Sequence, residues 1–285
     1  MQGRRCDIIN HLCQCMGDLY PADEARRIAR IVAAKLSNSN EIKFLTEPNE
    51  IITIEGLEQV AEELAAGRPV QYITGECEFC GLEFKVREGA LIPRPETEEL
   101  VMWAVERAKD IASPRIADVC TGSGCIAISL AKLLQGAEIT ATDISDDAIA
   151  LANENAEKLG AKVNIIKDDA LGGLQALQGR EWDIIVSNPP YIPLSEQESM
   201  HINVINHEPH IALFVEDSDP LLFYRAIARS ARELLSEEGC LLFEIHSPLA
   251  TECLDMLKEE GYTEVEVRKD FCGRERMICC RKRQK

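Results

Sequence analysis

The spacing of apolar residues predicts helices in the first part of the chain. Apolar positions between residues 28 and 36, and again between 57 and 64, recur at the spacing of one helix face. Gly67 followed by Pro69 predicts the end of the second of these helices. The outer positions are polar, so we predict a small bundle of about four helices. No group of residues in this region suggests chemistry.

A different pattern begins near Cys77. Apolar residues flank Gly81 on both sides, which predicts a β-hairpin between residues 77 and 86. The segment Pro93-Arg94-Pro95 then forms a stiff connector before a helix that begins near Thr97. We therefore predict a helical domain over residues 1–76, a hairpin and proline-rich connector over 77–95, and a second domain over 96–285.

Short apolar runs alternate with helical patterns in the second domain. The predicted strands are Arg115–Cys120, Glu138–Asp143, Val163–Asp168, Trp182–Ser187, Cys240–Ile245, Thr263–Arg268 and Arg276–Cys280. Helical patterns separate the first five, which predicts a mostly parallel sheet covered by helices on both faces. The last two strands have only residues 269–275 between them and should pair antiparallel. This α/β pattern fits the Rossmann-like seven-stranded sheet of methyltransferases, with its antiparallel last strand, better than an all-parallel dehydrogenase sheet.

The charge balance argues against one class of function. The chain has 49 acidic and 31 basic residues, which gives a net charge of −18. A protein that coats nucleic acid needs clustered Lys and Arg to neutralise phosphates. We therefore expect no stable nucleic-acid partner, although the sequence leaves a local basic patch open.

We expect a cytoplasmic protein with no membrane partner. No apolar run approaches the roughly 20 residues that span a bilayer, and the N-terminal residues contain no apolar core of a signal peptide. The twelve cysteines should then be reduced thiols that pack as small apolar groups. No metal site is predicted, because no second Cys or His pair accompanies Cys77 and Cys80.

The first strand of the second domain runs into a glycine-rich turn. The segment reads Ala117-Asp118-Val119-Cys120-Thr121-Gly122-Ser123-Gly124-Cys125-Ile126-Ala127. Gly122 and Gly124 allow a tight turn and close approach of a ligand to backbone N–H groups. Asp143 follows 19 residues after Gly124, where a carboxylate can accept hydrogen bonds from both ribose hydroxyls. The spacing alone fits NAD and S-adenosylmethionine equally. Asp118 favours the second, since an acid attracts a sulfonium and repels a pyrophosphate.

Asp168 and Asp169 end the third strand of this domain. In a Rossmann-like methyltransferase, this loop lies beside the adenine, where a carboxylate can accept from the exocyclic amine. An acidic turn without a ligand is the alternative.

The fourth strand ends in Asn188-Pro189-Pro190-Tyr191, at the edge where open α/β sheets bind ligands. Two consecutive prolines fix φ and lack N–H donors, so the Asn188 side-chain oxygen and the Pro189 carbonyl can form a rigid pair of acceptors. Tyr191 supplies a flat wall. Such a pair suits a planar –NH₂ group, whose nitrogen reacts when it is oriented toward a methyl donor. We predict catalytic roles for Asn188, Pro189 and Tyr191, and substrate binding by all four residues of the motif.

These motifs resemble Rossmann-like methyltransferases of amino groups, in which Asn-Pro-Pro-Tyr serves enzymes that modify adenine, guanine or glutamine. Other segments resemble the release factor glutamine methyltransferase family in particular, over nearly the whole chain. They are Arg68-Pro69-Val70-Gln71-Tyr72-Ile73-Thr74-Gly75, the Phe79–Phe84 hairpin, Leu91-Ile92-Pro93-Arg94-Pro95-Glu96-Thr97-Glu98, and His207-Glu208-Pro209 with Ala212-Leu213.

The resemblance implies methylation of the glutamine in the Gly-Gly-Gln motif of class I peptide-chain release factors. The donor would be S-adenosyl-L-methionine and the product S-adenosyl-L-homocysteine. The release factor would be a partner embraced by the helical domain and by the loop at residues 193–209, and we expect the enzyme to be a monomer. The residues implied for the cofactor are Cys120, Thr121, Gly122, Ser123, Gly124, Asp143, Asp169, Ala170 and Asn188.

The chain departs from the family pattern at several positions. Cys120 stands where many members have glycine, at the first turn of the loop. Ala170 stands where some members carry an aromatic residue, so stacking on adenine must come from elsewhere, such as Leu171. His246 follows the fifth strand, where glycine is common, and we expect a structural role for it.

Two other functions remain open from the sequence. An adenine N6 methyltransferase of DNA or RNA could use the same Asn-Pro-Pro-Tyr motif, but predicts a basic groove and an inserted recognition segment. A non-catalytic nucleotide- or release-factor-binding module is the second alternative, and the intact Asn188, Gly122 and Gly124 argue against it. An NAD oxidoreductase leaves Asn-Pro-Pro-Tyr unexplained.

Overall fold

The computed structural model describes residues 1–283 and divides into two compact units. The first unit contains Met1–Glu76 and the segment Met200–His207. The second contains Cys77–Ser199 and the chain from Glu208 onward. Within residues 1–283, no helix combines the length and the apolar character needed to cross a bilayer.

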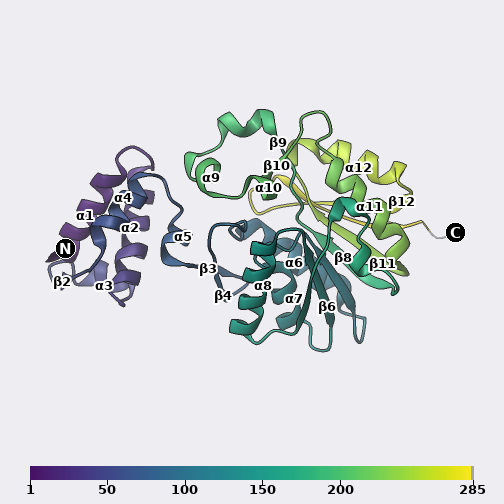
Figure 1. Ribbon diagram of the computed structural model, residues 1–285, viewed down its shortest axis with the longest axis horizontal. Helices are drawn as coiled ribbons and strands as arrows, with labels where there is room; N and C mark the ends of the chain where they lie inside the picture. The colour runs from purple at the N-terminus through teal and green to yellow at the C-terminus, as the bar shows by residue number, and fades with distance from the viewer. Residues whose placement is uncertain (284–285) are drawn as a thin grey trace. The chain divides into compact units, whose positions relative to one another are not determined.

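The first unit consists of short helices around one apolar core (Figure 1). Its helices are α1 (Arg5–Met16), α2 (Ala22–Leu36), α3 (Glu41–Thr46), α4 (Leu57–Ala65), α5 (Val70–Thr74) and α9 (Ile202–His207). The apolar faces of α1 to α5 meet at buried side chains that include Ile8, Leu12, Val32 and Leu64, whereas α9 adds no buried side chain to this core. The predicted helical region is confirmed. Two strands, β1 (Gln2–Arg4) and β2 (Ile51–Thr53), pair antiparallel and were not predicted, because three residues are too few to show an alternating pattern.

The second unit is built on a seven-stranded sheet, with strand order β12-β13-β11-β8-β5-β6-β7 (Figure 1). The strands are β5 (Arg115–Val119), β6 (Glu138–Asp143), β7 (Val163–Lys167), β8 (Trp182–Ser187), β11 (Leu235–Glu244), β12 (Tyr262–Lys269) and β13 (Glu275–Lys282). β13 pairs antiparallel with both β11 and β12, and the remaining pairings are parallel. The predicted Rossmann-like fold class is confirmed.

Helices cover both faces of this sheet, because successive residues of its central strands point to opposite sides. Ile116 and Ile184 face a core formed with α6 (Pro95–Ala108), α7 (Cys125–Leu133) and α8 (Asp146–Leu159). Ala117 and Ile185 face a second core, formed with α11 (Leu222–Leu234) and α12 (Ala250–Glu259). Short elements complete the unit: α10 (His210–Leu213), β9 (Ile192–Pro193), β10 (Phe214–Val215), and the 3₁₀ turns η1 (Ala170–Gly172), η2 (Gln175–Leu177), η3 (Leu194–Ser199) and η4 (Ser247–Leu249).

The predicted hairpin is also present, as β3 (Glu76–Phe79) and β4 (Leu82–Lys85). Its two turn residues, Cys80 and Gly81, have φ of +49° and +70°. Two successive residues with positive φ are what a two-residue turn needs to match the twist of its strands.

Candidate active site

A cavity opens where the parallel strands β5, β6, β7 and β8 end. This is the edge at which open α/β sheets bind ligands. Loops after these strands form most of the wall, and the segment before α6 and the region of α10 and α11 complete it. The lining residues are Gly89, Ala90, Leu91, Val119, Cys120, Gly122, Thr142, Asp143, Ile144, Ser145, Ala148, Asp168, Asp169, Ala170, Leu171, Asn188, Pro190, Ile211, Ala212 and Phe223.

The loop after β5 turns through left-handed backbone at Cys120, Gly122 and Gly124, with φ of +62°, +57° and +81°. Gly124 also lacks room for a side chain, since a Cβ would lie 2.9 Å from the end of the Ile128 side chain and 3.1 Å from the Ala152 Cβ. Gly122 faces open space, so its backbone conformation alone favours glycine there. Cys120 adopts the left-handed region although it is not glycine. This backbone conformation explains why glycine would suit the position.

Asp143 closes this loop from the end of β6. Its Oδ2 accepts from the Gly122 N–H at 2.8 Å and its Oδ1 from the Ser145 N–H at 2.9 Å. Burial raises the pKa of Asp143, and these backbone hydrogen bonds oppose that rise. Each carboxylate oxygen can accept more than one hydrogen bond, so capacity remains for ribose hydroxyls.

Asp118 braces the loop without lining the cavity. The side chain is fully buried, and its Oδ2 accepts from the Thr121 hydroxyl at 2.5 Å and from the Ala127 N–H at 3.2 Å. Burial raises the pKa of Asp118 to about 7, against the effect of these two hydrogen bonds. Asn155 on α8 donates to the Ser123 carbonyl at 3.0 Å. Thr121 and Ser123 thus fix the path of the loop outside the cavity lining, as does Gly124, and their assignment to the cofactor stays a prediction.

Cys120 places a thiol on the cavity wall. Burial raises the pKa of this thiol well above its usual value, and the carboxylates of Asp143 and Asp118 raise it further. The sulfur is therefore protonated at neutral pH.

The loop after β7 presents both acidic and apolar groups. Asp168 accepts from the Asp169 and Ala176 N–H groups, each at 2.9 Å, and Asp169 accepts from the Leu171 N–H at 2.8 Å. The side chains of Ala170 and Leu171 line the cavity beside them. Leu171 therefore adds an apolar residue to this part of the wall, and its contact with adenine stays a prediction.

β8 delivers the Asn188–Tyr191 motif to the same cavity. Asn188 and Pro190 line it, whereas Pro189 is buried outside the lining. The structure thus brings Asn188 together with Asp143 and Asp169 on one cavity wall, and their roles toward a cofactor stay predictions.

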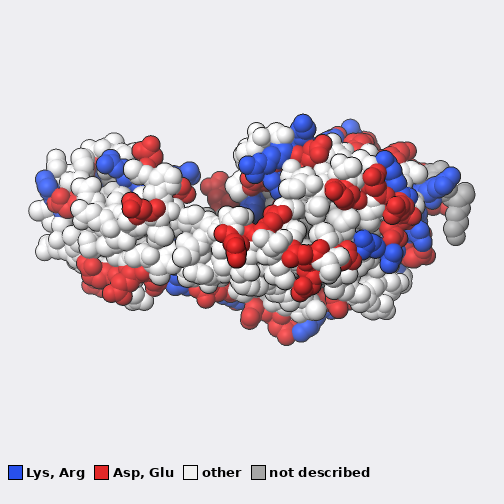
Figure 2. Space-filling view, turned by 90° about the horizontal axis from the view of Figure 1, so that it is seen from above, with Lys and Arg blue, Asp and Glu red and all other residues white. Residues whose placement is uncertain are grey.

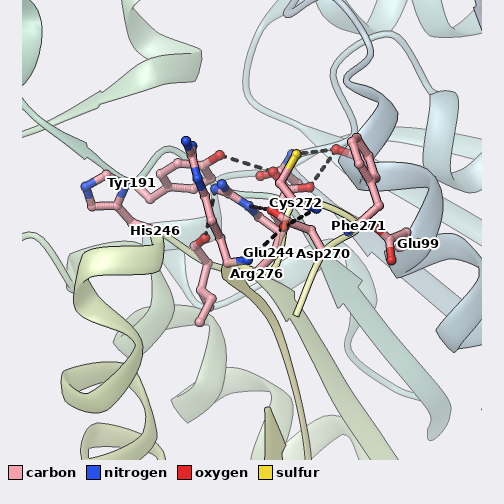
Figure 3. A network of polar contacts seen from close by, with 12 residues as sticks. Glu99, Tyr191, Glu244, His246, Asp270, Phe271, Cys272 and Arg276 are labelled. Carbon is pink, nitrogen blue, oxygen red and sulfur yellow. Dashed lines mark hydrogen bonds and ion pairs between the residues drawn. The ribbon is translucent and has the colours of Figure 1, made fainter. Parts of the chain in front are cut away.

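Tyr191 is held from two sides and is not among the lining residues. Its N–H donates to the Leu213 carbonyl at 3.2 Å. Its ring stacks on His246, with centroids 5.7 Å apart and planes inclined by 22° (Figure 3). His246 Nε2 in turn lies 2.9 Å from a carboxylate oxygen of Glu196, so this histidine packs against the motif.

The polar groups of the motif converge on one buried carboxylate, Glu244, at the end of β11. The Asn188 side-chain N–H donates to the Thr97 hydroxyl oxygen at 3.4 Å, and the Thr97 hydroxyl donates to Glu244 Oε2 at 2.6 Å. The Tyr191 hydroxyl donates to Glu244 Oε1 at 3.1 Å (Figure 3). Burial raises the pKa of Glu244, and the hydrogen bonds from Thr97 and Tyr191 and the charge of Arg276 oppose the rise.

Sequence reasoning assigned no role to several residues of this site. They are Gly89, Ala90, Leu91, Thr97, Ile211, Phe223 and Glu244. Glu244 carried a usable signal, because it is the one acid within the apolar run Cys240–Ile245. The small and apolar wall residues carry none: Gly89, Ala90 and Leu91 lie in a loop, and Ile211 and Phe223 lie in α10 and α11.

Two family models match the chain. The Methyltransferase small domain matches residues 99–211, and the PrmC N-terminal domain matches residues 8–75.

Curated relatives match nearly the full length. The release factor glutamine methyltransferase of Bacteroides thetaiotaomicron is 40% identical over 274 residues, which cover 95% of this chain and 98% of the relative. The release factor glutamine methyltransferase of Flavobacterium psychrophilum is 40% identical over 271 residues, which cover 93% of this chain and 94% of the relative.

Solved methyltransferase structures share the fold. The hMettl16 catalytic domain in complex with MAT2A 3′UTR hairpin 6 superimposes with a TM-score of 0.60 and 18% identity, over 78% of this chain and 83% of that one. A methyltransferase from Pyrococcus furiosus superimposes with a TM-score of 0.50 and 15% identity, over 71% of this chain and 89% of that one. At these identities the likeness concerns the fold alone.

Proposed function

This chain belongs to the release factor glutamine methyltransferase family, and on that premise we propose that it methylates the side-chain amide nitrogen of a glutamine in a peptide-chain release factor. The target is the glutamine of the Gly-Gly-Gln motif of class I release factors, and S-adenosyl-L-methionine is the donor. One observation carries the proposal: Asn188 lines the same cavity as Asp143 and Asp169. A glutamine amide held by Asn188 would face a methyl donor held by Asp143 and Asp169.

The cavity suits S-adenosylmethionine better than a cofactor with phosphates. Asp143, Asp168 and Asp169 lie along its wall, and its described lining residues include no Lys or Arg. A sulfonium and an ammonium group are attracted to such carboxylates, whereas a pyrophosphate is repelled. We assign the ribose hydroxyls to Asp143 and the apolar contacts of the adenine to Ala170 and Leu171.

The bound cofactor supplies a methyl group on a positively charged sulfur. The protein's part is to hold an amide nitrogen in line with that methyl group. An amide nitrogen is a weak nucleophile, because its lone pair is delocalised into the carbonyl. Asn188 Oδ1 and the Pro189 carbonyl would accept from its two hydrogens, orient it and favour its pyramidal form. The methylated amide is acidic enough to lose its proton to water, so we assign no side-chain base.

An exocyclic amine of adenine is also a planar –NH₂ group, so the motif by itself admits a nucleic-acid substrate. The charge of the chain favours a protein. Its net charge is −18, and Asp and Glu side chains are spread widely over the visible face in Figure 2. Binding to nucleic acid depends on neutralising phosphates with Lys and Arg.

The test is methyl transfer from radiolabelled S-adenosylmethionine to a class I release factor. We expect label in the intact release factor and none in a variant whose Gly-Gly-Gln glutamine is replaced. Label that does not depend on this glutamine, or that enters DNA or RNA instead, would overturn the assignment.

Asn188→Ala tests the site within the same assay. We expect turnover to fall by about 100-fold or more, because one of the two acceptors is lost. Binding of S-adenosylhomocysteine, measured by calorimetry, should change little. Turnover equal to that of the wild type would remove Asn188 from the mechanism.

A further inference from the structure

Glu244 is a buried carboxylate to which the transfer reaction gives no direct role. Its exposed fraction is 2%, and it lies outside the cavity lining. Placing a carboxylate inside a protein is unfavourable unless hydrogen bonds compensate. The neighbouring strand β8 runs parallel to β11, with Phe243 opposite Ser187, so Glu244 lies level with Asn188. The hydrogen bonds that Glu244 accepts can therefore influence the side chains of the Asn-Pro-Pro-Tyr motif.

The two oxygens of Glu244 accept from two different side chains of the site. Oε1 accepts from the Tyr191 hydroxyl and Oε2 from the Thr97 hydroxyl. Thr97 lies in the first turn of α6 and its side chain is buried, with an exposed fraction of 2%. A hydroxyl has one proton to donate. Because the carboxylate takes this proton, the Thr97 oxygen can only accept from its other neighbour, Asn188.

This donor count fixes the orientation of the Asn188 amide. The NH₂ group must face Thr97, as observed at 3.4 Å, because a flipped amide would set its oxygen against an oxygen without a free proton. The other end of the amide, Oδ1, is then the group left to accept from a substrate. A flipped Asn188 would instead present donors to an amide that needs acceptors.

We propose that Glu244, acting through Thr97, is a positioning residue that holds the Asn188 oxygen toward the glutamine amide. The inference rests on the proposed function, since it concerns how that site is aligned. The other oxygen of Glu244, Oε1, accepts from the Tyr191 hydroxyl and so holds that side chain. One buried carboxylate thus orients both polar side chains of the Asn-Pro-Pro-Tyr motif.

The test is Thr97→Val, which keeps the size and burial of the side chain and removes its hydroxyl. We expect kcat for release factor methylation to fall by about 10- to 100-fold, as for a modest misplacement of a reacting group. KM for the release factor and the affinity for S-adenosylhomocysteine should stay within about threefold, because distant contacts set them. Thr97→Ser keeps the hydroxyl and should restore most of the turnover.

Matched variants separate positioning from a loss of structure. Thr140→Val changes another buried threonine of the same unit, outside the cavity lining, and should leave turnover and melting temperature near wild type. In an Asn188→Ala background, Thr97→Val should cause no further loss, because the group it orients is gone. Glu244→Gln should lower kcat by a smaller factor, since a glutamine can donate to Thr97 as well as accept from it.

Three outcomes would overturn the inference. They are wild-type turnover in Thr97→Val, an equal loss in Thr97→Ser, and a full additional loss in the Asn188→Ala background. Label in the wild type and in Thr97→Val alike would refute this inference alone. A release factor that stays unlabelled in every reaction would refute the proposed function as well.

Discussion

Asn155 on α8 ties three segments of the second unit together, and its removal gives a sharp test of how the glycine loop is held. Its side chain is fully buried. Oδ1 accepts from the Lys85 N–H at 2.7 Å, and Nδ2 donates to the carbonyls of Lys85 and Ser123, each at 3.0 Å. These bonds join α8 to strand β4 and to the loop after β5. The perturbation is Asn155→Ala.

The expected loss follows from these contacts. A buried hydrogen bond contributes about 1 kcal/mol net, so three of them give about 3 kcal/mol. The two bonds to the Lys85 backbone are part-buried, whereas the bond to the Ser123 carbonyl is buried and its loss leaves that carbonyl without this partner. In a unit of this size, each kcal/mol lowers the melting temperature by about 2–4 °C, so we expect a decrease of about 6–12 °C.

Thermal unfolding gives the melting temperature and urea unfolding gives the free energy of unfolding; both are followed by circular dichroism without cofactor. Asn153→Ala is the matched control: Asn153 lies on the same helix, is exposed, and donates to the Ile149 carbonyl of its own helix. Its substitution should change stability by no more than about 0.5 kcal/mol. If Asn155→Ala lost less than about 1 kcal/mol, or no more than the control, this account of the loop would be refuted.

Two further predictions concern the glycine loop itself. Gly124→Ala should destabilise by about 2–4 kcal/mol, because left-handed strain adds to a Cβ placed 3.1 Å from that of Ala152. Gly160→Ala, at φ +59° with no atom within 4 Å, should show strain alone, about 1 kcal/mol, in the same unfolding assay. Asp118 has its pKa raised by burial to about 7, so between about pH 4 and pH 7 the folded state binds more protons than the unfolded chain. Wild-type stability should therefore fall as pH rises through this window, by up to about 4 kcal/mol relative to Asp118→Asn. If the free energy of unfolding of the wild type and of Asp118→Asn changed with pH by the same slope, that reasoning would be contradicted.

Local patterns were sufficient to predict most of the sheet. β6 and β8 have the predicted bounds, because each is rich in β-branched residues and is followed by polar turn residues. β11 begins at Leu235, earlier than predicted, since residues 236–239 are polar or glycine and the register with β8 shifts there. An irregular strand of this kind has no periodic signal.

Contacts between distant residues set the limit of prediction from sequence. His201 stacks on Tyr20, with ring centroids 5.3 Å apart, and its Nε2 lies 3.0 Å from the Leu19 carbonyl. Such contacts place the segment Met200–His207 in the first unit. No local sequence pattern predicts these contacts.

The residues of the candidate site also fall into two groups, those that local patterns predict and those that only tertiary contacts bring into the site. Asp143 and Asn188 could be found because each ends a strand at the ligand-binding edge of the sheet. Their supporting residues could not. Thr97 is separated from Asn188 by 91 positions along the chain, and Asn155 is separated from Ser123 by 32. Only the folded chain brings these residues together.

The thiol of Cys120 gives this site an unusual chemical vulnerability. Cys120 lies on the wall of the cavity to which we assign the methyl donor, and in that assignment an ionised thiol would compete with the glutamine amide for the methyl group. Burial and the neighbouring Asp143 and Asp118 raise the pKa of the thiol, which would limit methylation of the enzyme by its own donor under the proposed function. Changes that admit water beside Cys120 would weaken this effect most, because burial is the largest cause of the raised pKa.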